Sequence, residues 1–172
     1  MVLDAAMIEF AAHGLHGGTV EAIAQRVGVS QPYLFHLFGT KKKLFLAAVS
    51  RGFDRTRSAF ETAVAALPPE ARGDKLSVLA AMGHAYADLL YDRTLLQLQL
   101  QAYAACEDLE VRALVREWFT GLQAYVADVA KADEAELAGF FGAGMLMNVG
   151  AAMDAAEIDE SWARILCREG NA

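Results

Sequence analysis

Cysteine and proline are both rare in this chain of 172 residues, which contains two cysteines and three prolines. Cys106 and Cys167 are too few for a disulfide framework or a zinc site, so we expect two ordinary thiols. The prolines stand at expected helix boundaries. Pro32 falls in the first turn of one helix, and Pro68 and Pro69 end another.

Signatures of catalysis are equally sparse. The chain has no nucleophile elbow, no phosphate-binding loop and no His and Glu residues at metal-ligand spacing. The acids Asp133, Glu134 and Glu136 stand at an expected helix start, where the helix dipole favours them. We therefore predict a protein that is not an enzyme and that has no cofactor and no metal. A small all-α ligand carrier or enzyme that does not use DNA remains the alternative class.

Nothing in the sequence predicts export or a membrane anchor. The N-terminus lacks a basic region followed by an apolar run, so we expect a cytoplasmic protein. Residues 137–153 are uncharged, but this stretch is short for a bilayer span and contains Asn148 and several glycines. We interpret it as a buried or interfacial helix, with no membrane partner.

Charge is unevenly distributed along the chain. The net charge is −7 at pH 7, yet residues 1–57 hold seven basic and four acidic side chains, a balance of +3. Residues 58–172 therefore carry −10. This asymmetry indicates a basic head and an acidic body, and the acidic body weakens non-specific attraction to DNA.

Residues 19–38 have the pattern of a helix, a tight turn and a second helix. Gly28 stands where a helix ends with positive φ, and Ser30 can cap the next helix. The apolar residues of the first helix have helical spacing: Val20, Ile23, Ala24 and Val27. The expected inner face of the second helix is formed by Leu34, Leu37 and Phe38. The arrangement is typical of a helix-turn-helix, although a plain helical hairpin has the same pattern.

A third helix follows at once and opens with three lysines. Thr40 can cap it, and Lys41, Lys42 and Lys43 fill its first turn. Lysine there opposes the helix dipole, so local stability does not explain it, whereas a bound phosphate would. A solvated face is the alternative interpretation.

Residues 3–49 resemble the DNA-binding domain of the TetR family of transcriptional regulators. The matching residues are Leu3-Asp4-Ala5-Ala6, Phe10-Ala11, Gly14, Thr19-Val20, Ile23-Ala24, Gly28-Val29-Ser30, Leu34-Phe35-His36-Leu37-Phe38, Thr40-Lys41 and Leu44. The sequence departs from the family at Phe35, usually tyrosine, at Leu37, commonly histidine, and in having no basic arm before Leu3. The alternative interpretation is therefore that this protein binds a ligand but has weak or lost DNA affinity.

The resemblance and the helix pattern assign roles at the DNA. Gln31 is the expected base reader, Pro32 faces a thymine methyl, and Tyr33 and His36 reach base edges or phosphates. Thr19 is expected to cap the helix that begins at Val20 and to offer its backbone amide to a phosphate. Leu34, Leu37 and Phe38 should pack inside. The predicted DNA-binding residues are Thr19, Ser30, Gln31, Pro32, Tyr33, His36, Lys41, Lys42 and Lys43.

The rest of the chain predicts helices over about 41–67, 74–91, 94–105, 108–130, 134–155 and 159–168. Residues 96–101 alternate Leu and Gln as a strand would, but both residues favour helix and no partner strand is visible. The face expected inside 74–91 is Leu76, Leu79, Gly83, Tyr86 and Leu90, and that of the last helix is Trp162, Ile165 and Leu166. We predict an all-α fold of about nine helices, with a helix-turn-helix domain over 1–48 and an effector-binding and dimerisation domain over 49–172.

The resemblance also implies a homodimer formed by the last two long helices, a palindromic operator and a small-molecule effector. Small residues and methionines in 134–155 are consistent with close helix packing, between subunits or within one core. The predicted dimer residues are Phe140, Gly144, Met147, Ala151, Trp162 and Ile165. The predicted ligand-binding residues are Met82, Tyr86, Leu98, Tyr103, Trp118, Phe119, Leu122, Met145 and Asn148. Apolar walls favour a hydrophobic or aromatic effector, and repression is the common mode of the family.

Overall fold

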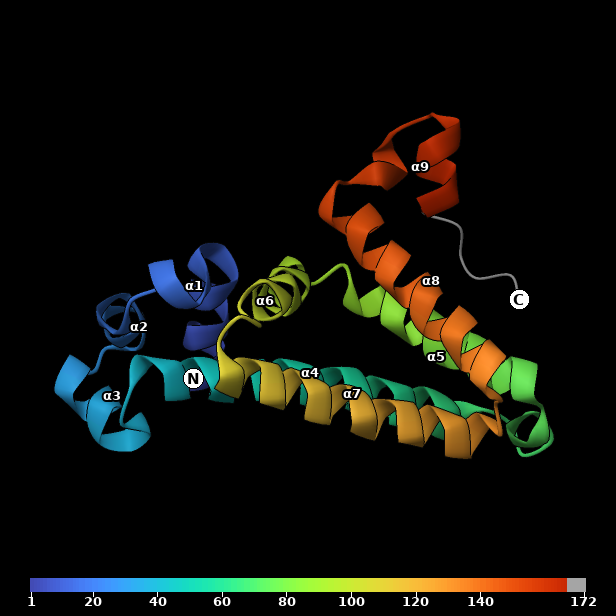
Figure 1. Ribbon diagram of the computed structural model, residues 1–172, viewed down its shortest axis with the longest axis horizontal. Coiled ribbons are helices and arrows are strands. Elements are labelled where there is room, and N and C mark those ends of the chain that lie inside the picture. Colours follow the sequence, from blue (N-terminus) through green and yellow to red (C-terminus); the bar gives the residue numbers. More distant parts are fainter. Residues whose placement is uncertain (167–172) are drawn as a thin grey trace. The chain divides into compact units, whose positions relative to one another are not determined.

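The computed structural model describes residues 1–166, and all regular structure in them is helical (Figure 1). Within these 166 residues the nine α-helices are α1 (Val2–Gly17), α2 (Val20–Val27), α3 (Gln31–Phe38), α4 (Lys41–Ala66), α5 (Lys75–Leu89), α6 (Arg93–Ala104), α7 (Leu109–Ala130), α8 (Glu134–Ala152) and α9 (Ser161–Leu166). Two 3-10 turns, η1 (Ala71–Gly73) and η2 (Ala155–Glu157), connect them. The all-α prediction is confirmed, and 94–105 is helical. Cys167 and the predicted end of the last helix lie outside the described residues.

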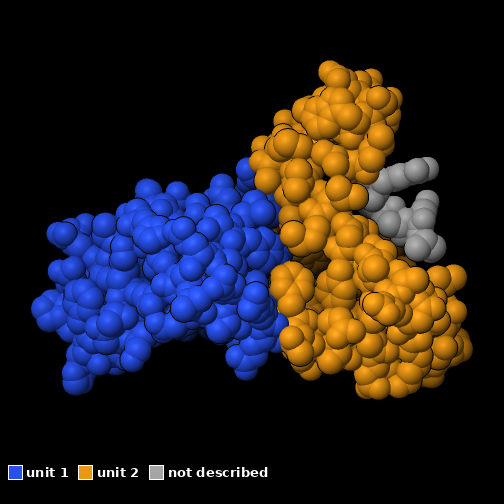
Figure 2. All heavy atoms as spheres, in the orientation of Figure 1, with its two compact units in different colours: residues 1–55, 93–118 blue, residues 56–92, 119–172 orange. Residues whose placement is uncertain are grey.

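Two compact units divide the chain (Figure 2). Unit 1 comprises residues 1–55 and 93–118, and unit 2 comprises residues 56–92 and the chain from residue 119 onward. The long helices α4 and α7 each contribute residues to both units. Unit 1 is larger than the predicted domain 1–48, because α1 packs along α6 and brings that helix into the same unit. The functional boundary at residue 48 stays a prediction.

Unit 1 is built around α1, which kinks at Gly14. The backbone there has φ 67° and ψ −174°, a conformation that is essentially restricted to glycine. A Cβ at this position would also lie 2.5 Å from Gln101 Oε1 of α6. One turn earlier on α1, Phe10 meets Phe45 of α4 edge to face at 5.1 Å. Gly14 therefore allows α1 and α6 to approach closely.

The predicted helix caps are all present. Thr19 Oγ1 accepts the Ala22 N–H, Ser30 Oγ accepts the Tyr33 N–H, and Thr40 Oγ1 accepts the Lys43 N–H. Gly28 adopts φ 73° and ends α2 by donating its N–H to the carbonyls of Ala24 and Gln25. Local hydrogen bonds therefore fix where α2, α3 and α4 begin.

Three predicted inner faces were partly wrong. On α3, Leu34 is buried but Leu37 is 50% exposed, because Leu37 shares a helix face with Tyr33 one turn earlier. On α5, Leu76 is exposed, and the buried stripe has a spacing of four residues: Val78, Met82 and Tyr86. On α9, Trp162 and Ile165 are exposed and Ala163 is buried.

Unit 2 packs α8 against α5 and α9. Lys75 of α5 and Glu136 of α8 form an ion pair at 2.8 Å, and Phe60 of α4 makes edge contacts with the rings of Tyr86 and Phe140. Of the helices in residues 1–166, α8 has the length and hydropathy of a membrane span, although composition alone places it in that class. Only 17% of that stretch is fully buried, and Met145, Leu146 and Val149 leave part of this apolar helix exposed in a single chain.

We expect Gly14→Ala to destabilise the protein by about 1–3 kcal/mol, because alanine strongly disfavours this backbone conformation. The melting temperature measures the effect. Gly83→Ala in α5 is the matched control: an added Cβ there meets nothing within 4 Å, and alanine favours a helix interior. Equal melting temperatures for the two variants would contradict the role assigned to Gly14.

Candidate nucleic-acid interface

The predicted base readers lie on the exposed face of α3. Gln31, Pro32, Tyr33 and His36 are all exposed, with Tyr33 48% accessible. Ser30, also exposed, begins the helix as its cap. The buried Leu34 anchors the other side of the helix. The face opposite the core therefore offers an amide, a phenol, an imidazole and a proline ring to a partner.

Two further side chains belong to this face that the sequence analysis did not assign to it. Phe35 is 41% exposed and Leu37 is 50% exposed. The outward face of α3 is thus more apolar than predicted, since Leu37 had been expected inside. Spacing could have found Leu37, because it stands four residues after Tyr33 on the same helix. Apolar side chains in a major groove contact thymine methyl groups, so Leu37 joins Pro32 as a candidate for that contact.

The amide of Thr19, predicted to meet a phosphate, is already bonded within the chain. Its N–H donates to Glu9 Oε1 at 3.1 Å, and Glu9 is only 5% exposed. His13 Nδ1 lies 3.4 Å from the same carboxylate oxygen. Glu9 thus provides negative charge at the start of α2, where a phosphate was expected.

Lys41 also has partners within its own unit. Its ammonium donates to the carbonyl oxygens of His16 at 3.0 Å and Gly18 at 3.2 Å. These carbonyls end α1, so Lys41 ties the start of α4 to the end of α1. The side chain acts as a helix C-terminal cation, and a phosphate would have to compete with two carbonyls for it.

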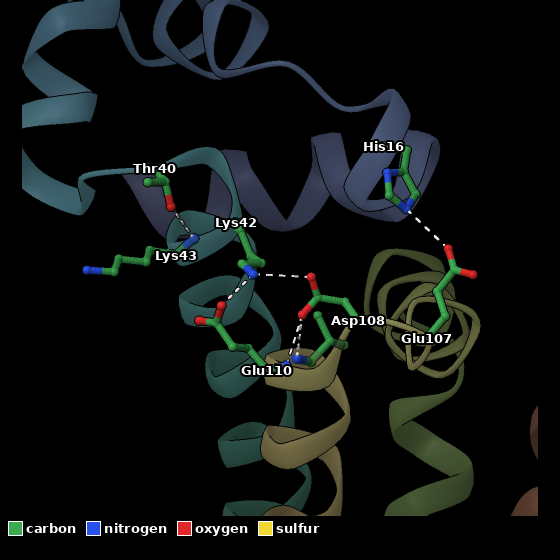
Figure 3. A network of polar contacts seen from close by, with 8 residues as sticks. His16, Thr40, Lys42, Lys43, Glu107, Asp108 and Glu110 are labelled. Atoms are coloured by element: carbon green, nitrogen blue, oxygen red, sulfur yellow. Dashed lines mark hydrogen bonds and ion pairs between the residues drawn. The ribbon is translucent and has the colours of Figure 1, made fainter.

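Lys42 lies between two acids at the start of α7 (Figure 3). Its ammonium is 3.2 Å from Asp108 Oδ2 and pairs directly with Glu110. Beside this pair, His16 Nε2 lies 3.7 Å from Glu107 Oε1. We call residues 107, 108 and 110 the acidic corner. It brings negative charge from 66 residues away onto the lysine run.

The contacts of the acidic corner shift the pKa values of the groups involved. Hydrogen bonds with Glu110 and Asp108 raise the pKa of Lys42 above its usual value. Partial burial favours a higher pKa for Asp108, but hydrogen bonds from Lys42 and from the N–H groups of Val111 and Glu110 lower that pKa overall. Lys42 and Asp108 therefore keep their charges at neutral pH.

Lys43 differs from its two neighbours. Its side chain is exposed and points away from the acidic corner (Figure 3). Within residues 1–166 its ammonium has no hydrogen-bond or ion-pair partner, while its backbone N–H is held by Thr40. Of the three lysines, Lys43 is therefore the most available to a phosphate.

The predicted ligand-binding residues are distributed over the two units. Leu98, Tyr103 and Trp118 belong to unit 1, where Leu98 is in the core and Trp118 stacks on Phe53 at 4.1 Å. The unit 2 members are Met82, Tyr86, Phe119, Leu122, Met145 and Asn148. Among these, Tyr86 and Asn148 are joined by a buried hydrogen bond of 2.7 Å. No group of three or more His, Cys, Asp or Glu in the described part of the chain could hold a metal ion.

The predicted dimer residues also separate into two sets. Phe140 contacts the rings of Phe60 and Phe141, and Gly144 faces the Tyr86 ring, so these two lie against their own subunit. Met147 and Ala151 are half-buried. The exposed apolar residues of this region are instead Met145, Leu146, Val149 and Met153, together with Trp162 and Ile165 of the predicted set.

Comparison with known proteins agrees with the geometry of the first three helices. Residues 2–48 match the family described as bacterial regulatory proteins, tetR family. A stretch of 46 residues of this chain is 46% identical to the HTH-type transcriptional repressor AcnR of Corynebacterium efficiens. That match covers 27% of this chain and 24% of the relative, so it concerns about a quarter of each protein.

Solved structures resemble the whole chain. A TetR-like transcriptional regulator from Rhodococcus sp. RHA1 has a TM-score of 0.70 at 20% identity, covering 96% of this chain and 88% of that one. The transcriptional regulator FadR from Bacillus subtilis, in complex with stearoyl-CoA, has a TM-score of 0.71 at 17% identity, covering 99% and 98%. At these identities the likeness shows the fold. Residues 2–48 thus match the tetR family of bacterial regulatory proteins, and the chain as a whole shares the fold of these solved regulators.

Proposed function

We propose that this protein is a ligand-responsive transcriptional repressor that binds a palindromic operator as a homodimer. The observation that carries the proposal is the exposed face of α3, held by the Gly28 turn and the Ser30 cap. Gln31 and Tyr33 reach base edges there, with Gln31 suited to a bidentate contact with adenine. The AcnR relative, which is similar over 46 residues, is named as a transcriptional repressor, and this supports the same function.

Phosphate contacts form a smaller part of this interface than the lysine run implies. Lys43 is the principal phosphate contact, while Lys41 and Lys42 mainly hold unit 1 together. Fewer free cations reduce the electrostatic share of the affinity and leave a larger share to base contacts. The same observation favours a second candidate function, a helical ligand-binding protein with weak or lost DNA affinity.

The uncovered face of α8 and α9 forms the dimer interface. Met145, Leu146, Val149 and Met153, with Trp162 and Ile165, leave a run of large apolar side chains in water in a single chain. A two-fold axis through such a face buries it against its own copy. The resulting pair of α3 helices would lie about 34 Å apart, matching one turn of DNA.

Unit 2 binds the effector, and its aromatic side chains favour an apolar or aromatic molecule. The FadR neighbour was solved in complex with stearoyl-CoA, whose acyl chain is apolar although its coenzyme A part is charged. The protein acts in the cytoplasm, where its DNA lies, and has no enzymatic role, as is typical of tetR-family regulators.

Selection of operator DNA from a random pool tests the proposal directly. We expect the full chain to enrich inverted repeats with half-sites about 10 base pairs apart. Gln31→Ala should lose preference at one base pair in each half-site, by about 1–3 kcal/mol. Gln25→Ala, which changes an exposed glutamine on α2, is the control and should keep the wild-type preference. Failure to enrich any sequence would favour the alternative with lost DNA affinity.

Release of Lys42 from the acidic corner should strengthen binding to all DNA sequences alike. In Asp108→Asn with Glu110→Gln, the freed ammonium gains a phosphate, and the salt dependence of log K steepens by about 1. Affinity measured across salt concentrations checks this, and adding Lys42→Ala should cancel the gain.

The matched control for that experiment removes two carboxylates elsewhere. Asp128→Asn with Asp159→Asn breaks two exposed ion pairs of unit 2 and changes the net charge equally. A rise in affinity of the same size in this control would assign the effect to net charge and not to Lys42.

Replacing Leu146 by glutamate should dissociate the dimer. A charge in the centre of an apolar interface is desolvated without a partner, so we expect the dimer dissociation constant to rise at least about tenfold. Sedimentation equilibrium measures this. Leu76→Glu is the matched control on α5, since Leu76 (56% exposed) and Leu146 (48% exposed) are similarly accessible. An equal loss in both variants would contradict the assigned interface.

A further inference from the structure

Asn148 of α8 is the most deeply buried polar side chain of unit 2. None of its surface is accessible, and its Oδ1 accepts the hydroxyl of Tyr86 from α5 at 2.7 Å. The two helices pack against each other in this unit (Figure 1). The carboxamide oxygen is thus fully satisfied.

The amide nitrogen of Asn148 is poorly satisfied by comparison. Its hydrogen-bond partner among the described residues is the thioether of Met145, with Nδ2 to Sδ at 3.8 Å. A thioether is a weak acceptor, and Nδ2 has two hydrogens to donate. At least one strong donor is therefore left without an oxygen acceptor in the interior of unit 2.

The chain satisfies a similar group elsewhere. Gln99 in unit 1 is also buried, and its Nε2 donates to the Tyr103 hydroxyl at 2.8 Å. A buried donor without a proper acceptor costs about 1–3 kcal/mol. Stability therefore does not account for Asn148, whereas a ligand that supplies the missing acceptor would.

A second unsatisfied polar group lies in the same unit. The hydroxyl of Thr56 on α4 is buried and has no hydrogen-bond partner within the described residues. Phe60, one turn later on that helix, meets the Tyr86 ring edge to face at 6.1 Å. Unit 2 thus combines aromatic rings with two under-used hydrogen-bonding side chains.

Charge limits the class of molecule that could use these groups. Among residues 1–166, the buried polar side chains of unit 2 are Thr56 and Asn148, and both are neutral. An ionised group brought to Asn148 would lose its hydration and find no buried counter-charge. The group that meets the Asn148 amide must therefore be a neutral acceptor.

We propose that the effector is an uncharged, largely apolar molecule with a carbonyl oxygen that accepts a hydrogen bond from Asn148 Nδ2. A ketone, an ester or an amide has the required chemistry. This inference rests on the proposed effector binding by unit 2 and specifies which chemical class it recognises. The Tyr86 hydroxyl holds the Asn148 side chain in place for that contact.

Three probes of similar shape test the inference on the full chain. Acetophenone has a ring and a carbonyl, ethylbenzene has the ring without an acceptor, and benzoate carries a charge. We expect acetophenone to raise the melting temperature more than ethylbenzene at equal concentration, and benzoate to have the smallest effect. Equal shifts, a larger shift with benzoate, or no shift with any probe would overturn the inference.

Variants then assign the effect to Asn148. In Asn148→Leu with Tyr86→Phe, acetophenone should lose its advantage over ethylbenzene, whereas Gln99→Met in unit 1 should keep it. Without ligand, the double variant should melt at or above the wild-type temperature, because it removes a poorly satisfied amide. A fall of more than about 4 °C would show that the amide is a structural group and would overturn the inference.

DNA binding is measured separately, without any probe. If the chain enriches no operator but still prefers acetophenone through Asn148, the repressor proposal fails and the ligand class stands. If operator binding holds and the preference is absent, the ligand class alone fails.

Discussion

The left-handed turn at Gly28 is the constraint on which the proposed interface depends. Its N–H closes α2 by bonding to two carbonyls, and Ser30 starts α3 only two residues later. With so short a connection, the direction of α3 follows from the backbone of Gly28, and Leu34 then fixes its rotation by entering the core. The turn therefore determines the positions of the exposed side chains from Gln31 to Leu37.

The polar and charged groups of unit 1 that were expected to meet phosphate mostly have partners within the unit. Glu9 accepts the backbone N–H at the start of α2, and a carbonyl at the end of α1 accepts a hydrogen bond from Lys41. The acidic corner forms ion pairs with Lys42. Each contact replaces a partner that DNA phosphate would otherwise provide. A protein that contacts bases but few phosphates binds its specific site with greater selectivity over non-specific DNA, because the sequence-independent part of its affinity is small.

Unit 2 presents the opposite arrangement, with an acidic exterior and a neutral interior. Its ion pairs, such as Lys75 with Glu136, lie at partly exposed positions, while Asn148 and Thr56 are the polar groups kept inside. Polar groups retained in a core without full hydrogen bonding cost stability, and proteins keep them where binding requires them. The exposed apolar face of α8 also indicates a binding partner, because a large apolar patch on a single chain is typical of an interaction surface.

Local chemistry determined much of the fold from the sequence alone. Caps at Thr19, Ser30 and Thr40 and the turn at Gly28 act over a few residues, so their side chains predicted the helix boundaries correctly. Helix propensity identified α6 as a helix despite the strand-like alternation of Leu and Gln, because both residues favour helical backbone. Periodicity was less reliable for orientation on short helices, as Leu37 and Trp162 show, since one position around the helix decides burial.

Only the tertiary structure decided which charges and amides are already in use. The acids that meet Lys42 lie 66 residues further along the chain, and the tyrosine that holds Asn148 lies 62 residues before it. The amino-acid sequence of a lysine run is the same whether its partners are phosphates or carboxylates of the same chain. Sequence proximity carries no information about such pairs, because they form when distant helices pack and not through the local backbone preferences that residue types encode.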